Sequence, residues 1–208
     1  FKLLAAAAIL KRVDDGRESL DRRVVFDAGS IVVGSPLTSQ RIGGQGMALA
    51  DICEAAITRS DNTAGNLMLE TIDGPAGLTR FVRAMGDPVT RLDRIEPDLN
   101  EAMAGDPRDT TTPLSMLGDL RALLTGNVLS HASREQLVAW LVGNRTGDAR
   151  LRAGFPRDWR IGDKTGTGEN GAAGDVAVVW PPQGEPVLIA AYVTETAASL
   201  DQRNACFA

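Results

Sequence analysis

The separation of helical from extended sequence restricts the fold of this chain more than any other feature. Strand-type sequence is concentrated after Asp158, in three segments divided by turn-rich residues: Trp159–Thr167, Gly174–Trp180 and Pro186–Thr194. Most of the sequence before Asp158 has helical periodicity or the composition of loops. Because the helices precede the strands instead of alternating with them, we expect an α+β fold with an antiparallel sheet.

The sequence ahead of the sheet contains several amphipathic helices. From Met47 to Arg59, apolar residues recur on one helical face: Leu49, Ile52, Cys53, Ala56 and Ile57. Cys53 lies on that face, which indicates a buried free thiol. The Ala-rich run Phe1–Arg12 is too short to cross a bilayer, and we expect a buried core helix there. Further helices are expected at about 63–71, before Gly86, after Thr112-Pro113, at about 132–142 and from about Ser199.

The net charge and the few histidines and cysteines narrow the functional classes. The 208 residues carry a net charge of −5 without a basic stripe, which disfavours a nucleic-acid partner. His131 is the only histidine and falls in the first turn of an expected helix, so we expect a structural role and no Ser-His-Asp triad. Cys53 and Cys206 are too far apart in sequence to indicate a metal site or a disulfide scaffold. These counts therefore give no indication of a metal site.

The segment Asp87–Asp109 has little periodicity and contains three prolines. A connection of this length inside a compact domain is usually functional or disordered. Arg94 near its start and Asp109 at its end can form a bidentate ion pair, which predicts a pinned loop.

The stretch Asp163–Gly168 has the composition of an edge strand, being Thr-rich with glycines where a partner must approach the backbone. The unpaired backbone groups of an edge strand can bind a flat substrate as well as another strand. Lys164 adds a positive charge, and Thr165 and Thr167 add hydroxyl donors on either side of Gly166. This combination predicts a binding site for a carboxylate beside a carbonyl group.

Four short sequence elements follow one another in a characteristic order. They are Lys2, Ser60-Asp61-Asn62, Glu96 with Asn100, and Lys164-Thr165-Gly166. The set resembles the Ser-x-x-Lys, Ser-Asp-Asn and Lys-Thr-Gly motifs of the class A serine β-lactamases, and the resemblance covers essentially the whole chain. Arg108–Thr111 also resembles the end of the omega-shaped loop of that family.

The resemblance implies a β-lactamase/transpeptidase-like fold, in which an all-helical subdomain packs on an antiparallel sheet flanked by helices. Residues 1–155 would form most of the helical subdomain, with residues 13–35 partly at the junction with the sheet. Residues 91–109 would form the omega-type loop, called the omega loop below. Residues 156–208 would form the sheet and the C-terminal helix of the α/β subdomain, whose N-terminal part we expect ahead of Phe1.

The resemblance also assigns roles for a reaction through a serine acyl-enzyme. In a Ser-x-x-Lys motif that contains Lys2, the nucleophilic serine would lie two positions before Phe1, so we expect this chain to begin just after it. Lys2 would take a proton from that serine, with a pKa lowered by burial and by the charge of Lys164. Ser60 would pass a proton to the lactam nitrogen.

The remaining roles concern substrate binding. The substrate carboxylate would be bound by Lys164, Thr165, Gly166 and Thr167. The backbone N–H of Thr167 would contribute to the oxyanion hole. Asn62 would bind the amide of the substrate side chain.

Glu96 distinguishes between the possible reactions of such a site. With Asn100 it would hold a water molecule against the acyl carbonyl, which predicts hydrolysis of the acyl-enzyme. The alternatives are a penicillin-binding protein, acting as a peptidoglycan transpeptidase or carboxypeptidase, and a non-hydrolytic β-lactam sensor. Penicillin-binding proteins lack the Glu96–Asn100 arrangement, so its presence argues against them, and the intact loop argues against a sensor.

The chain departs from the family pattern at several positions. The arginine that often follows Lys-Thr-Gly is absent, and Arg150 matches an alternative arginine that supports the substrate carboxylate. A solvated surface arginine is the other interpretation of Arg150, and both stay open. Gly34 replaces an aromatic residue at the rim of the site, which predicts a more open mouth. Ala6 stands where some members have a cysteine paired with the position of Cys53, so we expect Cys53 to be free.

The family acts outside the cytoplasm, which implies a periplasmic or secreted bacterial protein with a signal sequence upstream of Phe1. The resemblance implies no metal and no organic cofactor, and the expected partner is a small β-lactam molecule. We expect no nucleic-acid partner, no association with a membrane and a monomeric protein.

Overall fold

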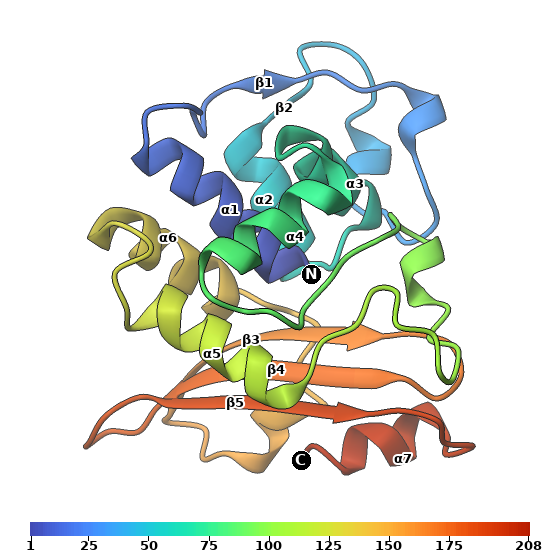
Figure 1. Cartoon of the computed structure of the whole chain (residues 1–208), viewed down its shortest axis with the longest axis vertical. Helices are drawn as coiled ribbons and strands as arrows, with labels where there is room; N and C mark the ends of the chain where they lie inside the picture. The colour runs from blue at the N-terminus through green and yellow to red at the C-terminus, as the bar shows by residue number, and fades with distance from the viewer.

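A computed structural model describes all 208 residues of the chain, and it consists of a helical part and a three-stranded sheet (Figure 1). Its helices are α1 (Lys2–Asp14), α2 (Leu49–Thr58), α3 (Asn62–Thr71), α4 (Gly74–Ala84), α5 (Pro113–Leu124), α6 (His131–Val142) and α7 (Leu200–Ala205). Its strands are β1 (Arg23–Val24), β2 (Met47–Ala48), β3 (Arg160–Thr167), β4 (Ala173–Trp180) and β5 (Val187–Val193). None of the helices has both the length and the apolar composition that a membrane-spanning helix needs.

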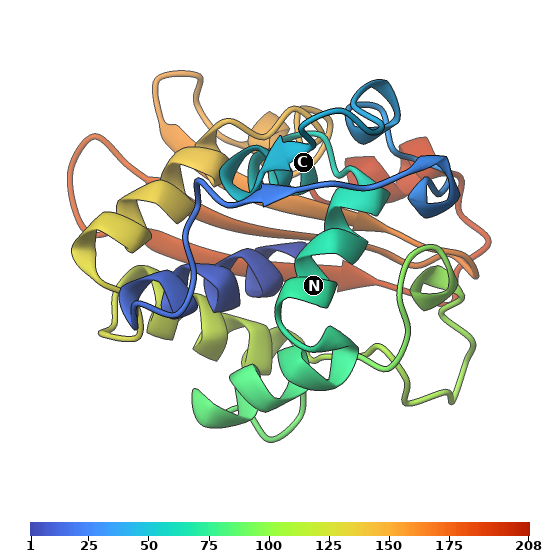
Figure 2. The same cartoon turned by 90° about the horizontal axis from the view of Figure 1, so that it is seen from above.

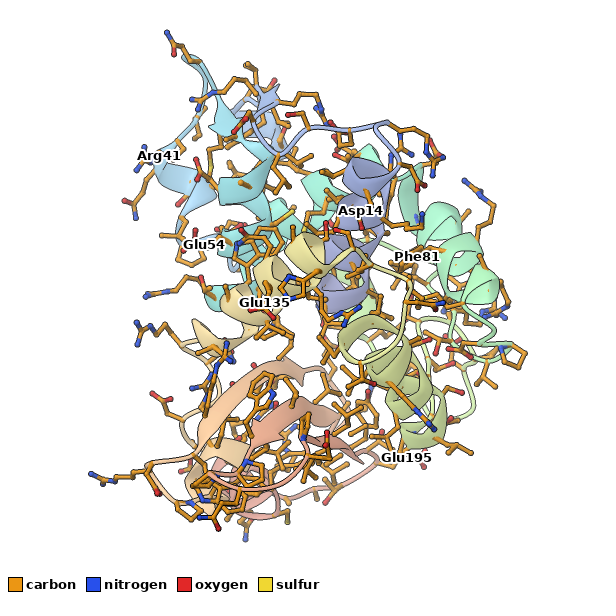
Figure 3. The ribbon with its side chains drawn as sticks, turned by 90° about the vertical axis from the view of Figure 1, so that its left-hand side faces the viewer. Asp14, Arg41, Glu54, Phe81, Glu135 and Glu195 are labelled. Carbon is orange, nitrogen blue, oxygen red and sulfur yellow. The ribbon has the colours of Figure 1, made fainter.

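The sheet is antiparallel, with the strand order β3-β4-β5. The predicted antiparallel sheet and the predicted edge position of residues 160–167 are therefore confirmed. Gly166 pairs with Gly174, and Lys164 pairs with Val176 on the central strand. Seven of the eight residues of β4 are buried, because helices of the helical part cover one face of the sheet and α7 lies on the other (Figures 1 and 3).

Helix α1 lies in the core of the helical part, next to α6 (Figure 2). Its first nine residues, Lys2 to Leu10, are all buried, which confirms the predicted core helix. Four consecutive alanines, residues 5–8, allow the neighbouring helices to approach closely, since alanine has only a methyl side chain. Lys2 is thereby carried into the interior at the end of α1 that faces the sheet.

The start of the helix predicted from Met47 differs from the prediction. Met47 and Ala48 pair with β1 as strand β2 instead of starting the helix, with Arg23 opposite Ala48. This tertiary pairing overrides the local helical pattern. Helix α3 ends at Thr71, where the prediction of about 63–71 places its end, and α4 begins at Gly74. Of residues 13–35, expected partly at the junction with the sheet, the part around β1 lies on the side of the helical part away from the sheet (Figure 1).

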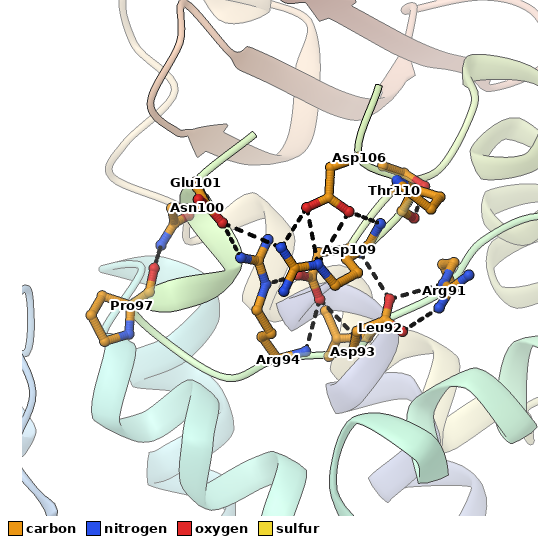
Figure 4. A network of polar contacts seen from close by, with 12 residues as sticks. Arg91, Leu92, Asp93, Arg94, Pro97, Asn100, Glu101, Asp106, Asp109 and Thr110 are labelled. Carbon is orange, nitrogen blue, oxygen red and sulfur yellow. Dashed lines mark hydrogen bonds and ion pairs between the residues drawn. The ribbon is translucent and has the colours of Figure 1, made fainter. Parts of the chain in front are cut away.

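The omega loop is pinned at its base, as predicted (Figure 4). The Arg94 guanidinium pairs with Asp109 at 2.6 Å and with Glu101. The Asp109 carboxylate also accepts hydrogen bonds from the backbone N–H groups of Asp93 and Arg94 at 2.7 and 2.9 Å. These contacts close the loop on itself and fix the position of the segment that contains Glu96.

Candidate active site

Asp61 fixes the backbone on one side of the candidate site, although its own carboxylate does not line that site. Its fully buried carboxylate caps α3 by accepting from the Ala64 N–H at 2.9 Å. It also accepts from the Leu37 N–H at 2.9 Å and from the Thr38 hydroxyl at 2.8 Å. Asp61 thereby holds the loop that contains Gly34 against the start of α3. Ser60, directly before it, has a left-handed backbone with φ of 54°.

Lys2 lies at the centre of a set of polar groups from three elements. Its Nζ atom donates to Asn62 Oδ1 at 2.6 Å and to the Ser60 carbonyl at 2.8 Å, and it pairs with Glu96 Oε1 at 3.0 Å. Lys2 is 5% exposed and Glu96 is 4% exposed. An ion pair this deeply buried is stable only when the remaining hydrogen-bonding positions are also filled, as they are here.

Glu96 is fixed through both its backbone and its carboxylate. The Glu96 N–H donates to Asn66 Oδ1 at 2.9 Å, and Asn66 Nδ2 donates to the Glu96 carbonyl at 3.0 Å. Asn100 Nδ2 donates to Glu96 Oε2 at 2.5 Å. The sequence analysis missed Asn66, whose only signal is its position one helical turn after Asn62 on α3.

Lys164 approaches the same site from the sheet. Its Nζ atom donates to Ser60 Oγ at 3.1 Å, and Lys2 Nζ lies 3.4 Å from the same oxygen. Two ammonium groups thus face one hydroxyl oxygen. Because an ammonium group can only donate, Ser60 Oγ accepts from them, and its own proton is left for another partner.

The two lysines differ in what stabilises their charge. Burial, together with the charge of Lys2, lowers the pKa of Lys164 to about 7. Burial also lowers the pKa of Lys2, but the charge and hydrogen bond of Glu96 oppose that effect. The pKa of Lys2 is therefore lowered by burial, as expected, while the repulsion between the two ammonium groups lowers the pKa of Lys164. Lys2 has a carboxylate partner, whereas Lys164 contacts only hydroxyl and carbonyl oxygens.

Arg150 is 5% exposed and lies against the edge strand β3, so the surface interpretation is wrong. Its guanidinium donates to the carbonyls of Gly166 and Gly174 at 2.7 and 2.8 Å and to Thr167 Oγ1 at 2.6 Å. It also donates to Asn204 Oδ1 on α7 at 2.8 Å. Arg150 thus connects β3, β4 and α7.

A pocket of about 330 Å³ lies where these groups meet. Its lining includes residues named from the sequence, namely Ser60, Arg150, Thr165, Gly166 and Thr167. It also includes Thr146, Ala149, Leu200 and Asn204, which the sequence analysis missed. The hydroxyls of Thr146 and Thr165 share a hydrogen bond of 2.6 Å, a contact between residues that no motif connects. The lining of the pocket has four hydroxyl groups and one cation, Arg150, a combination that suits a carboxylate ligand.

The structure accounts for the glycine at position 34 and for the free thiol of Cys53. Gly34 has a φ of +81°, and a Cβ atom added there would lie 2.8 Å from Asn62 Nδ2. A side chain at position 34 would therefore displace the Asn62 amide. Cys53 is buried and free, as predicted, and burial raises the pKa of its thiol.

The whole chain, residues 1–208, matches the model of the beta-lactamase enzyme family. The β-lactamase AST-1 of Nocardia asteroides is 47% identical over 208 residues, which are 100% of this chain and 67% of that protein. This chain belongs to the class A β-lactamase family.

Solved structures agree with this assignment to class A. A class A β-lactamase described as the last common ancestor of Gram-negative bacteria is 59% identical, with a TM-score of 0.98, over 100% of this chain and 79% of that one. The PenP structure from Rhodopseudomonas palustris is 54% identical, with a TM-score of 0.97, over 99% of this chain and 78% of that one. The α+β architecture described above is thus the class A β-lactamase fold.

Proposed function

We propose that this protein hydrolyses the amide bond of penicillin- and cephalosporin-type β-lactams through a serine acyl-enzyme, and so confers antibiotic resistance. Family membership supports β-lactam hydrolysis. The observation that carries the mechanism is the Glu96 carboxylate, which bridges Lys2 at 3.0 Å and Asn100 at 2.5 Å. A site that only acylates has no need of this arrangement.

In the acylation step, the nucleophile is the serine three residues before Lys2 in the Ser-x-x-Lys register. Its proton leaves through Lys2 and Glu96, which contact each other directly. Ser60 then delivers its proton to the lactam nitrogen as the amide C–N bond breaks, and Lys2, which contacts Ser60 Oγ, passes the proton of the nucleophile back to Ser60. Both ammonium groups donate to Ser60 Oγ, so the hydroxyl proton of Ser60 can point toward that nitrogen. The backbone N–H of Thr167, on the edge strand, stabilises the oxyanion.

In the deacylation step, Glu96 and Asn100 position and activate a water molecule. Glu96 Oε2 accepts from Asn100 Nδ2, and Glu96 Oε1 faces Lys2, so the carboxylate has a fixed orientation. A fixed carboxylate is an effective general base because no free energy is spent on orienting it during the reaction.

Substrate recognition uses two opposite sides of the pocket. Lys164, Thr165 and Thr167 bind the carboxylate of the substrate, with Gly166 allowing a close approach to the strand. Arg150 donates to Thr167 Oγ1, which leaves the Thr167 hydroxyl proton to be donated to the carboxylate. Asn62 Nδ2 donates one N–H to the Val33 carbonyl at 2.9 Å, and its second N–H is available for the amide of the substrate side chain.

The proposal extends to partners and location. The substrate is a small molecule, and we propose a monomer that binds neither nucleic acid nor membrane and acts in the periplasm or as a secreted protein. The absence of a basic stripe and the extracytoplasmic action of the family support this part.

The test follows the intact mass of the full-length protein, including the serine before Lys2, after addition of a penicillin. We expect a transient adduct that returns to the free mass while ring-opened product accumulates. The Glu96→Ala variant should form the same adduct and keep it. A long-lived adduct on the unaltered protein would indicate a penicillin-binding protein or a sensor. Absence of both adduct and product would exclude the covalent mechanism.

A further inference from the structure

Two carboxyl groups, those of Asp87 and Asp119, lie outside the active site, at the base of the omega loop. Asp119 is on α5, the helix that follows the loop, and is 2% exposed. Its Oδ2 atom is buried and has no hydrogen-bond partner. A buried carboxylate without partners is costly, so a carboxyl group in this position is expected to be protonated or to have a close ionic partner.

The neighbour of Asp119 is Asp87, immediately ahead of the omega loop. The Asp87 carboxylate accepts from the Val89 and Thr90 N–H groups at 2.7 and 3.1 Å and so defines the turn Asp87–Thr90. Those N–H groups can bind a carboxylate but leave no donor for Asp119. Asp87 is buried as well, and a hydrogen bond between the two carboxyl groups forms only if one of them holds a proton.

The charged groups around the pair do not offset the repulsion between two buried carboxylates. Arg83, on α4, faces Asp119, but its Nη1 atom donates to the carbonyls of Asp87 and Thr90 at 2.7 and 2.6 Å. Tyr192, on β5, is the other titratable group influenced by Asp119, and it carries no positive charge. Neither residue forms an ion pair with Asp119.

We propose that Asp119 carries a proton that it donates to Asp87, and that this hydrogen bond fixes the turn from which the omega loop starts. Asp119 is then a positioning residue that acts on Glu96 through the loop. Only this consequence for Glu96 rests on the proposed function.

The titration behaviour of both groups supports the proposal. Burial, the charge of Asp87 and the hydrogen bond to Asp87 raise the pKa of Asp119 to about 7, against the effect of Arg83. Burial also disfavours the charge of Asp87, but hydrogen bonds from Thr90, Val89 and Asp119 outweigh it and lower the pKa of Asp87. The proton therefore resides on Asp119. Above about pH 7 it is lost, and two carboxylates repel each other beneath the loop.

A chain of short contacts leads from this turn to the active site. The Thr90 and Thr111 hydroxyls share a hydrogen bond of 2.6 Å, and the Arg91 N–H donates to the Thr110 carbonyl at 3.0 Å. Asp93 and Arg94 come next in the chain, and their N–H groups donate to the Asp109 carboxylate. Glu96 follows them after Ile95. Displacement of the turn Asp87–Thr90 would therefore move the segment that orients Glu96.

The test compares the thermal stability of the unaltered protein with that of Asp119→Asn between pH 4.5 and 8.5. An asparagine amide donates to Asp87 at every pH, so it reproduces the protonated acid. Between the unfolded pKa near 4 and the folded pKa near 7, the unfolded chain releases the Asp119 proton and the folded chain keeps it. We expect the Tm of Asp119→Asn to exceed that of the unaltered protein by at least about 3 °C more at pH 8.5 than at pH 4.5.

A second readout localises the effect and needs no catalytic activity. Hydrogen exchange of residues 88–96 should accelerate above pH 7, beyond the intrinsic increase, in the unaltered protein but not in Asp119→Asn. A Tm difference that does not change with pH, or equal protection in the two proteins, would overturn the proposal. If both readouts agree with it but the pH profiles of deacylation coincide for the two proteins, the Asp87–Asp119 bond stands and its link to Glu96 fails.

Discussion

Replacing Arg150 by Ala tests the architecture of the carboxylate-binding side of the pocket. The change removes four hydrogen bonds, to the carbonyls of Gly166 and Gly174, to Thr167 Oγ1 and to Asn204 Oδ1, at distances of 2.6 to 2.8 Å. It also removes a positive charge next to the groups proposed to bind the substrate carboxylate. The expected effects are therefore on both stability and substrate affinity.

The magnitude follows from the type of these contacts. A hydrogen bond to a charged group contributes about 1.5–3 kcal/mol, and water from the adjoining pocket can replace part of the four that are lost. A net destabilisation of about 3 kcal/mol corresponds to a decrease in Tm of about 6–12 °C for a chain of this size. A loss of about 1.4–2.8 kcal/mol of carboxylate binding corresponds to a KM that is about 10- to 100-fold higher.

The assay compares steady-state kinetics for a penicillin and for the same molecule with its carboxylate esterified. Arg150→Ala should raise KM for the anionic substrate, with a smaller change in kcat, and should leave the ester nearly unaffected. Arg150→Lys is the matched control, because it keeps the charge but cannot form the fork of hydrogen bonds, and it should give an intermediate result. An equal change for both substrates would refute the carboxylate argument, and an unchanged Tm would refute the structural one.

Two further predictions concern Lys164 and the omega loop. Because the pKa of Lys164 is lowered to about 7, the free enzyme loses this positive charge as the pH rises above 7, and KM for an anionic β-lactam should rise over that range while KM for its ester stays flat. A KM independent of pH for both substrates would contradict a role for the Lys164 charge. Arg94→Ala should leave the Asp109 carboxylate without its 2.6 Å ion pair, lower the stability of the omega loop and speed hydrogen exchange of residues 91–109, with β4 unchanged as the internal control. Unaltered exchange in the loop would show that backbone contacts alone hold it.

Local patterns determined much of this fold, because their physical causes lie close together in sequence. Strand-type composition and the turn residues between the segments located the three strands of the sheet to within a residue at each end. The apolar, Ala-rich start of the chain could only be buried, and α1 is the core helix. Arg94 and Asp109 could be paired from sequence because they flank a single loop. The order of the motifs was sufficient to indicate the family.

Tertiary structure decided what depends on contacts between distant segments. Arg150 could have been a surface residue, and only the approach of α7 and the two strands made it a buried centre of hydrogen bonds. Asn66 and Thr146 enter the site through partners that no local pattern reveals.

The relative proton affinities of Lys2 and Lys164 depend on which lysine has Glu96 as its partner. The proposed hydrogen bond between Asp87 and Asp119 likewise joins residues that lie on either side of the omega loop in the sequence. Burial and long-range electrostatics set these properties, and neither is encoded in the residues adjacent to the groups concerned.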